Sequence, residues 1–173
     1  AAFYPQVRTV FEIGGESAKY LRLDKQSILD YDRSGECAAG TGSFLDQQAL
    51  RMKHSVEEVG DLVCQAGCGA RIAGRCSVFA RSDMIHAQQK GFTPAEILRG
   101  LCDAVARNYK ASVVKGRKVT PPVALSGAVS QNAGVRGAQV LPVSRVGVRE
   151  SAALPEEDSA AEQLAGRLAP LAR

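Results

Sequence analysis

The sequence predicts an α/β fold in which helices pack around a small β-sheet. Strand-like segments come first, at residues 7–13, 18–23 and 28–31. Helical spacing of apolar residues then runs from Gly42 to about Val113, and a strand, a turn and a short helix follow. Strands succeeded by helices and then by a strand–turn–helix unit are typical of this class, with the helices segregated around the sheet.

The strand-like segments form a short β meander. In residues 18–23, Tyr and Arg alternate with Leu, which is the period of a half-buried strand. Gly14 and Gly15 lie between this segment and the first one, and paired glycines favour a tight turn between strands. Residues 28–31 are a weaker third strand.

Four helices are expected in the middle of the chain. Ser55 and Thr93 each begin a capping box, with Glu three residues later, and Pro94 occupies the first helical position. The other two helices are expected to start at Gly42 and to run from Ser77 to Gln89. The apolar side of the last helix carries Ile97, Leu98, Leu101, Cys102 and Val105.

The end of the chain gives a weaker pattern. Residues 122–125 are expected to form a short buried strand, and a short helix is expected from Asn132. Residues 146–173 are interpreted as a linker and a short C-terminal helix of unknown role. Because the chain does not begin with Met, we expect it to be a piece of a longer protein.

Composition excludes several classes of protein. The 173 residues are 45% hydrophobic and contain no apolar run long enough to span a membrane. A net charge of +4 is too mild to indicate a nucleic-acid partner. Five cysteines are an odd number, which argues against a complete disulfide framework. Together with the lack of a signal peptide, this predicts a reducing, cytoplasmic location.

Two cysteines lie at the starts of helix-like segments. Cys37 precedes the segment that begins near Gly42, and Cys76 precedes the segment 77–89. The positive end of a helix dipole stabilises a thiolate, and thiolates are the usual ligands of iron–sulfur clusters. A chain with two such thiolates needs a partner that offers two more. The alternative for Cys37 is a buried cysteine in a tight strand-to-helix turn.

Two glycine-containing segments are candidates for nucleotide binding. Gly14 and Gly15 follow a strand, so their N–H groups can approach a phosphate, while Glu16 can hold Mg²⁺ through water. A plain hairpin turn explains them equally well. Gly127 and Ala128 lie between a strand and a helix, where small residues let a base or ribose pack on the backbone. The alternative there is a plain connection.

The remaining cysteines and histidines offer weaker signals. A zinc site from Cys64, Cys68 and Cys76 is conceivable, but no His lies nearby and the CxxC spacing is absent. Cys102 falls on the apolar face of a helix and is expected in the core. His54 and His86 are expected to be structural or on the surface.

These motifs, in this order, resemble the ATP-dependent activator (archerase) family of the BadF/BadG/BcrA/BcrD type. Its members are activators of 2-hydroxyacyl-CoA dehydratases and ATPase subunits of benzoyl-CoA reductase. The resemblance covers roughly residues 7–140. It rests on residues 13–15, 37–45, 76–80, Gly127 and 132–135.

The resemblance implies the fold of the acetate and sugar kinases, actin and chaperone ATPases. It also implies a homodimer that shares one [4Fe–4S] cluster, uses ATP with Mg²⁺, and donates electrons to a dehydratase or acyl-CoA reductase. Cys37 and Cys76 would be the cluster ligands. The family's nucleotide residues would be Gly14 and Gly15 at the phosphates, Glu16 near Mg²⁺ or the attacking water, and Gly127 and Ala128 at the adenosine.

The chain departs from the family pattern in its nucleotide residues. The Gly-rich phosphate strand expected one subdomain upstream is absent, Glu16 stands where Gln is usual, and Ala128 stands where a second Gly is usual. Residues 1–145 are therefore expected to form an incomplete activator ATPase-like domain. The alternatives are a non-catalytic scaffold or regulatory remnant of the same fold, and a zinc-stabilised binding module.

Overall fold

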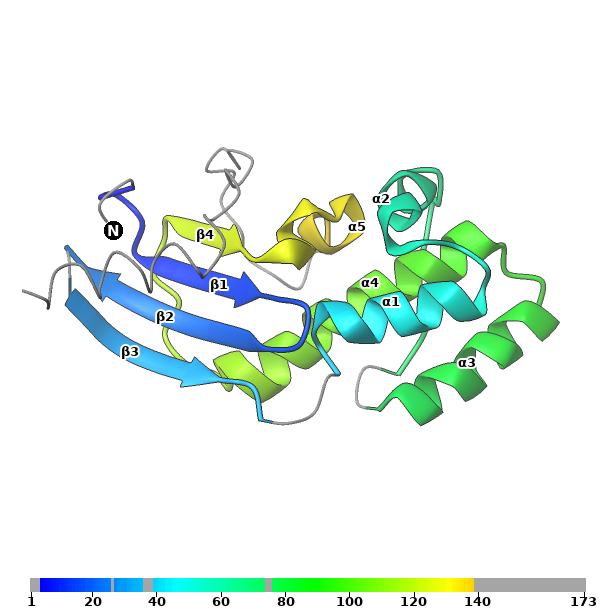
Figure 1. Ribbon diagram of the computed structural model, residues 1–173, viewed down its shortest axis with the longest axis horizontal. Helices are drawn as coiled ribbons and strands as arrows, with labels where there is room; N and C mark the ends of the chain where they lie inside the picture. The colour runs from blue at the N-terminus through cyan, green and yellow to red at the C-terminus, as the bar shows by residue number, and fades with distance from the viewer. Residues whose placement is uncertain (1–3, 26, 36–38, 74–75, 139–173) are drawn as a thin grey trace, which may run out of the picture.

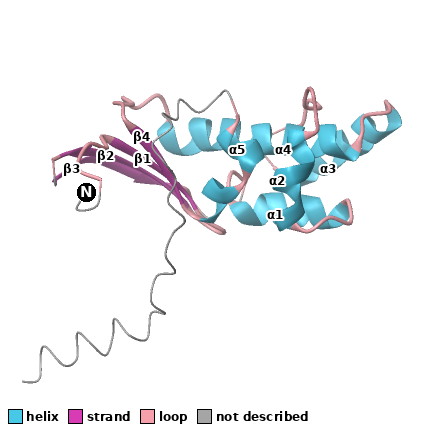
Figure 2. Ribbon diagram, turned by 90° about the horizontal axis from the view of Figure 1, so that it is seen from above, coloured by secondary structure: helices cyan, strands magenta, loops and turns pink. Residues whose placement is uncertain are grey.

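A computed structural model describes residues 4–25, 27–35, 39–73 and 76–138. A sheet forms one end of the molecule and a group of helices forms the other (Figures 1 and 2). The strands are β1 (Thr9–Ile13), β2 (Ala18–Asp24), β3 (Ser27–Arg33) and β4 (Val123–Ser126). The α-helices are α1 (Gly42–Arg51), α2 (Val56–Cys64), α3 (Ser77–Gln89), α4 (Pro94–Tyr109) and α5 (Ala133–Arg136). A π-helical turn, η1 (Lys110–Val114), and a 3₁₀ turn, η2 (Ala128–Gln131), complete the described elements.

The sheet has the strand order β3-β2-β1-β4. β1 pairs antiparallel with β2 and β2 pairs antiparallel with β3, as expected for a meander. β4 comes from far along the chain and pairs parallel with β1, with Phe11 opposite Leu125. Because β1 and β4 run in the same direction, their C-terminal ends meet at the same edge of the sheet.

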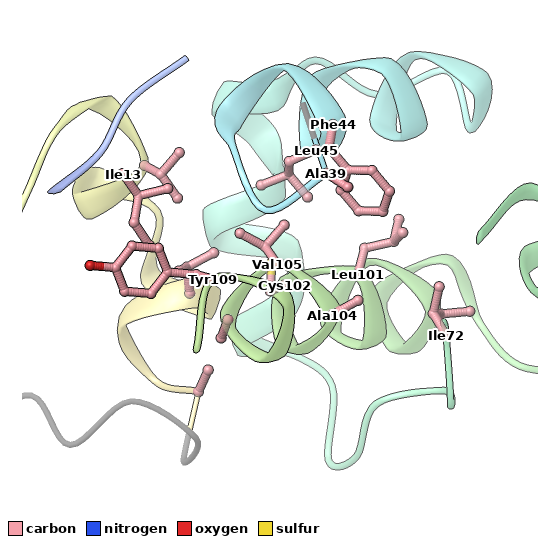
Figure 3. Packing of buried hydrophobic residues seen from close by; sticks show 14 of the residues in the cluster. Ile13, Ala39, Phe44, Leu45, Ile72, Leu101, Cys102, Ala104, Val105 and Tyr109 are labelled. Atoms are coloured by element: carbon pink, nitrogen blue, oxygen red, sulfur yellow. The ribbon is translucent and has the colours of Figure 1, made fainter. Parts of the chain in front are cut away.

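Helix α4 connects the sheet to the helical end. Its start is fixed by the Thr93–Glu96 capping box and by Pro94. Val105 and Leu101 point toward Leu45 and Phe44 of α1 (Figure 3). The apolar side predicted from sequence is fully buried, together with further residues of the helix. The buried residues are Ile97, Leu98, Gly100, Leu101, Cys102, Ala104, Val105, Ala106 and Tyr109.

Aromatic side chains fix the end of α4 against the sheet. The ring of Phe11 lies 5.4 Å from that of Tyr109, edge to face, and 6.3 Å from that of Tyr20. The Tyr109 hydroxyl donates to the Lys19 carbonyl at 2.8 Å, and the Tyr20 hydroxyl donates to the Lys118 carbonyl at 2.6 Å. Because both hydroxyls have a hydrogen-bond partner, burial of these two rings leaves neither hydroxyl unsatisfied.

The predicted elements are confirmed within the described residues, with small shifts of their bounds. The third strand is longer than predicted, and the helix after Thr93 changes to η1 after Tyr109. The turn η2 was not predicted. Expectations for residues 146–173, including the C-terminal helix, lie outside the described residues. None of the described helices is long and apolar enough to cross a membrane.

Candidate functional site

The four small residues predicted to bind nucleotide lie at one edge of the sheet. Gly14 and Gly15 follow β1, and Gly127 and Ala128 follow β4, at the C-terminal ends of the parallel pair. We call these residues the glycine edge. Gly127 has φ +88° and ψ 168°, a combination that is accessible essentially only to glycine. A side chain there would also put its Cβ 2.6 Å from the Ile13 carbonyl carbon, so the backbones require glycine.

The start of α1 is joined to the glycine edge. The backbone N–H of Gly42 donates to the Gly14 carbonyl at 2.9 Å, and that of Ser43 donates to the Gly15 carbonyl at 2.7 Å. The Ser43 hydroxyl also donates to the Gly15 carbonyl, at 2.8 Å. The first N–H groups of a helix have no partner within the helix, and here the turn after β1 supplies it. The turn and the start of α1 are therefore joined directly by hydrogen bonds.

The glycine edge has an open side. Gly15, Glu16 and Ala128 are exposed, and no atom lies within 4 Å of the position that a Cβ on Gly15 would take. Glu12, on the other flank of the turn, is half-buried and forms an ion pair with Lys19 at 3.0 Å. Glu16 is thus the carboxylate of this turn that faces solvent, while Glu12 has a structural partner.

Cys76 is the N-cap residue of α3, as the predicted helix 77–89 implied. Its backbone is extended, its carbonyl accepts from the Ala80 N–H at 3.0 Å, and its side chain makes no capping hydrogen bond. The residue is half-buried. The Cys76 side chain lies at the N-terminal, positive end of the α3 dipole. Cys37 lies outside the described residues.

The chain between Cys37 and α1 approaches the end of α4. Gly40 has φ +91°, and a Cβ there would lie 3.1 Å from the Asn108 side-chain nitrogen and 3.3 Å from the Tyr109 nitrogen. Thr41, the N-cap of α1, is fully buried. In Figure 1, α1 and α3 both begin at the end nearer the sheet. Gly40 therefore lies against the end of α4, and Gly42 is bonded to the turn that follows β1.

Comparison with known proteins agrees with this arrangement. Residues 1–158 match the model of the BadF/BadG/BcrA/BcrD ATPase family. The chain belongs to this family.

The relatives of this family member include dehydratase activators. It is 32% identical, over 78% of its length and 52% of the relative's, to the (R)-2-hydroxyglutaryl-CoA dehydratase activating ATPase of Acidaminococcus fermentans. It is 36% identical, over 76% of its length and 51% of the relative's, to the activator of lactoyl-CoA dehydratase of Anaerotignum propionicum. The chain thus spans about half the length of these relatives.

Solved activator structures share the fold. Component A of the A. fermentans dehydratase superposes with a TM-score of 0.73 at 32% identity, over 79% of this chain and 52% of that one. The activator of the 2-hydroxyisocaproyl-CoA dehydratase from Clostridium difficile, solved with bound ADPNP, superposes with a TM-score of 0.70 at 34% identity. The match covers 76% of this chain and 49% of that one. The family member described here is therefore part of an actin-like ATPase fold, which confirms the predicted class.

The remaining cysteines do not assemble into a metal site within the described part of the chain. No group of three or more His, Cys, Asp and Glu side chains there could hold a metal ion. Cys64 and Cys68 are exposed, and their thiols lie near the Gly60 carbonyl and Glu96. Cys102 is a core residue, as predicted, and burial raises the pKa of its thiol to about 12. The described residues give the zinc alternative no support.

Two features of the site were not predicted from sequence. The first is the bonding of α1 to the carbonyls of Gly14 and Gly15. The Gly42-Ser43 pair at the start of α1 could have indicated it, because a glycine lets another backbone come close to the helix. The second is the exposure of Val78 and Phe79, just after Cys76, at 67% and 65%. Apolar spacing alone does not distinguish a residue that faces the core from one that faces a partner.

Proposed function

We propose that this chain is part of an ATP-dependent activator that donates single electrons at low potential to a 2-hydroxyacyl-CoA dehydratase or a related acyl-CoA reductase. In this proposal, two copies of the protein share one [4Fe–4S] cluster held by Cys37 and Cys76 of each copy. Nucleotide with Mg²⁺ binds at the glycine edge. The partner enzyme follows from the names of the relatives, so it rests on similarity rather than on the residues of this chain.

The observation that carries the proposal is the direct bonding between the glycine edge and α1. The helix that follows Cys37 starts on the carbonyls of Gly14 and Gly15. A phosphate and Mg²⁺ bound by this turn would alter the positions of those carbonyls, and α1 would follow. The turn proposed to bind nucleotide is thus joined by short hydrogen bonds to the helix that follows Cys37 in the sequence.

The described residues fit a cluster of this kind. Cys76 has no capping bond to compete for its thiolate, and the α3 dipole favours negative charge at that position. Cysteine thiolates are the ligands that [4Fe–4S] clusters take, and such a cluster supplies a one-electron carrier. Two thiolates from each chain give the required four, so the homodimer is part of the proposal.

Exposed apolar side chains near Cys76 support an interface there. Val78 and Phe79 are 67% and 65% exposed, and both belong to the first turn of α3. Large apolar residues grouped on a surface often mark contacts with a partner. In a dimer about Cys76, they would be removed from water and would help to exclude it from the cluster.

The proposed nucleotide roles follow the arrangement of the glycine edge. Gly14 and Gly15 would contact the phosphates through their backbone, and exposed Glu16 would hold Mg²⁺ or orient the attacking water. Gly127 and Ala128, on the neighbouring strand, would line the adenosine. Since the chain spans half the length of its relatives, residues of the other half would be needed to complete the site.

Iron content tests the cluster. After anaerobic purification and reconstitution, the wild-type chain is expected to bind about two iron atoms per chain, half of a four-iron cluster shared by two chains. Cys37→Ala and Cys76→Ala should each abolish binding, whereas the exposed Cys64→Ala should not. Wild type without iron, or a Cys37→Ala protein that binds as much, would eliminate the cluster.

Nucleotide affinity is a separate test. Calorimetry with a non-hydrolysable ATP analogue and Mg²⁺ is expected to detect binding that weakens in a Glu16→Ala variant, while Glu57→Ala on α2 serves as a control. If iron binds but nucleotide does not, the chain is better described as a regulatory or scaffold remnant that retains the cluster.

A further inference from the structure

The chain that leads to Cys76 is held more firmly than a connection between two helices requires. We call its described part, residues 69–73, the Cys76 arm. Ala70 and Ile72, two residues apart along the arm, are 3% and 2% exposed, so both side chains lie in the core. The Ala70 carbonyl lies against Gly100 of α4 so closely that no Cβ fits at Gly100. The arm is therefore packed directly on the backbone of α4.

Three hydrogen bonds fix the arm in place. The Ala70 N–H donates to the Glu96 carbonyl at 2.9 Å, at the start of α4. The Arg107 guanidinium, through Nη2, donates to the Ile72 carbonyl at 2.7 Å. The Ala73 N–H donates to the Asp83 carboxylate, through Oδ2, at 2.7 Å. Two of these bonds involve a charged side chain, and charge-assisted bonds are stronger than neutral ones.

The bond to Asp83 closes a loop around Cys76. Asp83 belongs to α3, the helix that Cys76 caps, and it reaches back to Ala73, ten residues earlier in the sequence. Cys76 lies inside this loop, between an arm fixed on α4 and a helix fixed on the arm. Arg107 secures the same arm from the side of α4. Neither Asp83 nor Arg107 belongs to the glycine edge or to the cysteines.

We propose that Asp83 and Arg107 are positioning residues that hold the Cys76 thiolate in the geometry the cluster needs. This inference rests on the proposed cluster for its functional meaning. Ligand orientation, hydrogen bonding and solvent access control the potential of an iron–sulfur centre, so residues that fix a ligand also tune the centre.

The last turn of α4 contacts both cysteine-bearing segments. Arg107 bonds the arm, while Asn108 and Tyr109 are in contact with Gly40, between Cys37 and α1. Three consecutive residues of one helix thus restrain the approaches to both proposed ligands. This gives Arg107 a role that an exposed arginine on a helix would not otherwise have.

Thiol reactivity in the metal-free, full-length chain tests the positioning itself. We would compare the iodoacetamide labelling rate of Cys76 with that of Cys64, by peptide mass spectrometry, in wild type, Asp83→Ala and Arg107→Ala. Loss of a charge-assisted bond should increase local opening and raise the relative rate for Cys76 about tenfold. Asp83→Asn keeps an acceptor oxygen but loses the charge, so its labelling rate should lie between those of wild type and Asp83→Ala.

Matched controls come from the same helices. Ser82→Ala removes a neighbouring side chain on α3. Arg99→Ala removes an arginine of α4 whose stem lies beside Gly69 of the arm but whose guanidinium contacts Gly137 and Asp103 instead. Neither should change Cys76 labelling. Unchanged labelling in both Asp83→Ala and Arg107→Ala, or an equal rise in the controls, would overturn the inference. Arg107 is exposed, so its variant keeps the inference testable if Asp83→Ala does not fold.

The iron-loaded protein tests the functional half. Asp83→Ala and Arg107→Ala should retain iron but show a more positive midpoint potential and a broader electron paramagnetic resonance signal, since water reaches the reduced cluster more easily. Wild-type potential and signal in both would overturn the link between arm and cluster. Wild type without iron refutes the cluster, while the labelling result still decides whether the arm is held as described.

Discussion

The glycine edge and the Cys76 arm are both fixed by close backbone contacts, but the arm is also held by charged side chains. At the glycine edge, backbone meets backbone: Gly127 lies on Ile13, and α1 begins on the carbonyls of Gly14 and Gly15. At the arm, the charged side chains of Asp83 and Arg107 hold backbone groups. A substitution at a backbone contact forces a clash, whereas removal of a side-chain contact loosens the arm locally and introduces no clash.

The two regions should therefore affect different properties: the glycine edge the stability of the fold, and the surroundings of Cys76 the assembly with a partner. Substitution at the glycine edge should disrupt the sheet and the start of α1 together. Substitution around Cys76 should leave the fold intact and change what the surface of α3 binds. Four measurements would test this difference between the two regions.

The largest effect is expected for Gly127→Ala. The new Cβ would lie 2.6 Å from the Ile13 carbonyl carbon, at a backbone conformation that L residues avoid. We expect a loss of about 4 kcal/mol or more in the free energy of unfolding, measured by urea denaturation.

Gly91→Ala is the matched control for this variant. Gly91 also has a positive φ, +84°, but nothing lies within 4 Å of its would-be Cβ. Its loss should be about 1 kcal/mol, from backbone strain alone. Equal losses in the two variants would show that the contact with Ile13 does not restrict the glycine edge.

The interior of the helical end should respond to alkaline pH. Burial raises the pKa of the Cys102 thiol from 9.0 to about 12. Between pH 9 and 12 the unfolded chain releases this proton and the folded chain keeps it, so stability falls as the pH rises. By pH 11, this effect should lower the free energy of unfolding by an amount on the order of 2 kcal/mol.

Urea denaturation between pH 8 and 11 measures this effect. Cys102→Ala should flatten the decline relative to wild type, while Cys64→Ala, which removes an exposed thiol, should not. Burial also raises the pKa of Tyr109 and of Tyr20, and those groups contribute equally in wild type and variants. Parallel curves for wild type and Cys102→Ala would show that the Cys102 thiol is not shielded from water.

A smaller effect is expected for Gly42→Ala, at the junction of the glycine edge with α1. Its Cβ would lie 3.2 Å from both the Gly15 Cα and a Val129 methyl group, so the turn must shift slightly. We expect a loss of about 1 kcal/mol by urea denaturation, together with weaker nucleotide binding.

Gly60→Ala provides the helical control. Gly60 lies within α2, and its nearest neighbour, the Ala133 nitrogen, is 3.7 Å from the added Cβ. Alanine should stabilise the protein by up to about 1 kcal/mol there, since it has the higher helix propensity. A stabilising Gly42→Ala would indicate that the turn yields easily and that α1 is not firmly joined to it.

The sequence predicted the parts of the molecule that local chemistry determines. The capping boxes at Ser55 and Thr93 fixed two helix starts, and the apolar spacing of α4 identified its buried side. The order of the motifs indicated Gly14, Gly15, Gly127 and Ala128 as candidates for nucleotide binding. The parallel pairing of β1 with β4 brings these four residues to one edge of the sheet. That pairing spans more than one hundred residues, which a local pattern does not encode.

The contacts that could not be predicted depend on tertiary geometry. Asp83 fits a helix surface as well as any other polar residue, and only the fold shows that it bonds Ala73. Val78 and Phe79 have the spacing of core residues, yet α3 is buried through Ala80, Met84 and Ala87 instead. Two of the three buried residues are alanines, so α3 buries little apolar surface in the core and leaves Val78, Phe79 and Ile85 exposed.

The smallest effect on stability, and the sharpest on assembly, is expected for Val78→Ser. Val78 is 67% exposed and makes little contact with the core, so the free energy of unfolding should change by less than about 0.5 kcal/mol. If α3 forms the proposed interface, the iron-loaded variant should shift toward monomer in sedimentation velocity. Ile28→Ser is the control because Ile28 is 60% exposed and belongs to the edge strand β3. The sheet lies at the opposite end of the molecule from the helices (Figure 1). A loss of dimer in Val78→Ser alone would assign the interface to the helical end, whereas an equal loss in both, or a monomeric wild type, would contradict it.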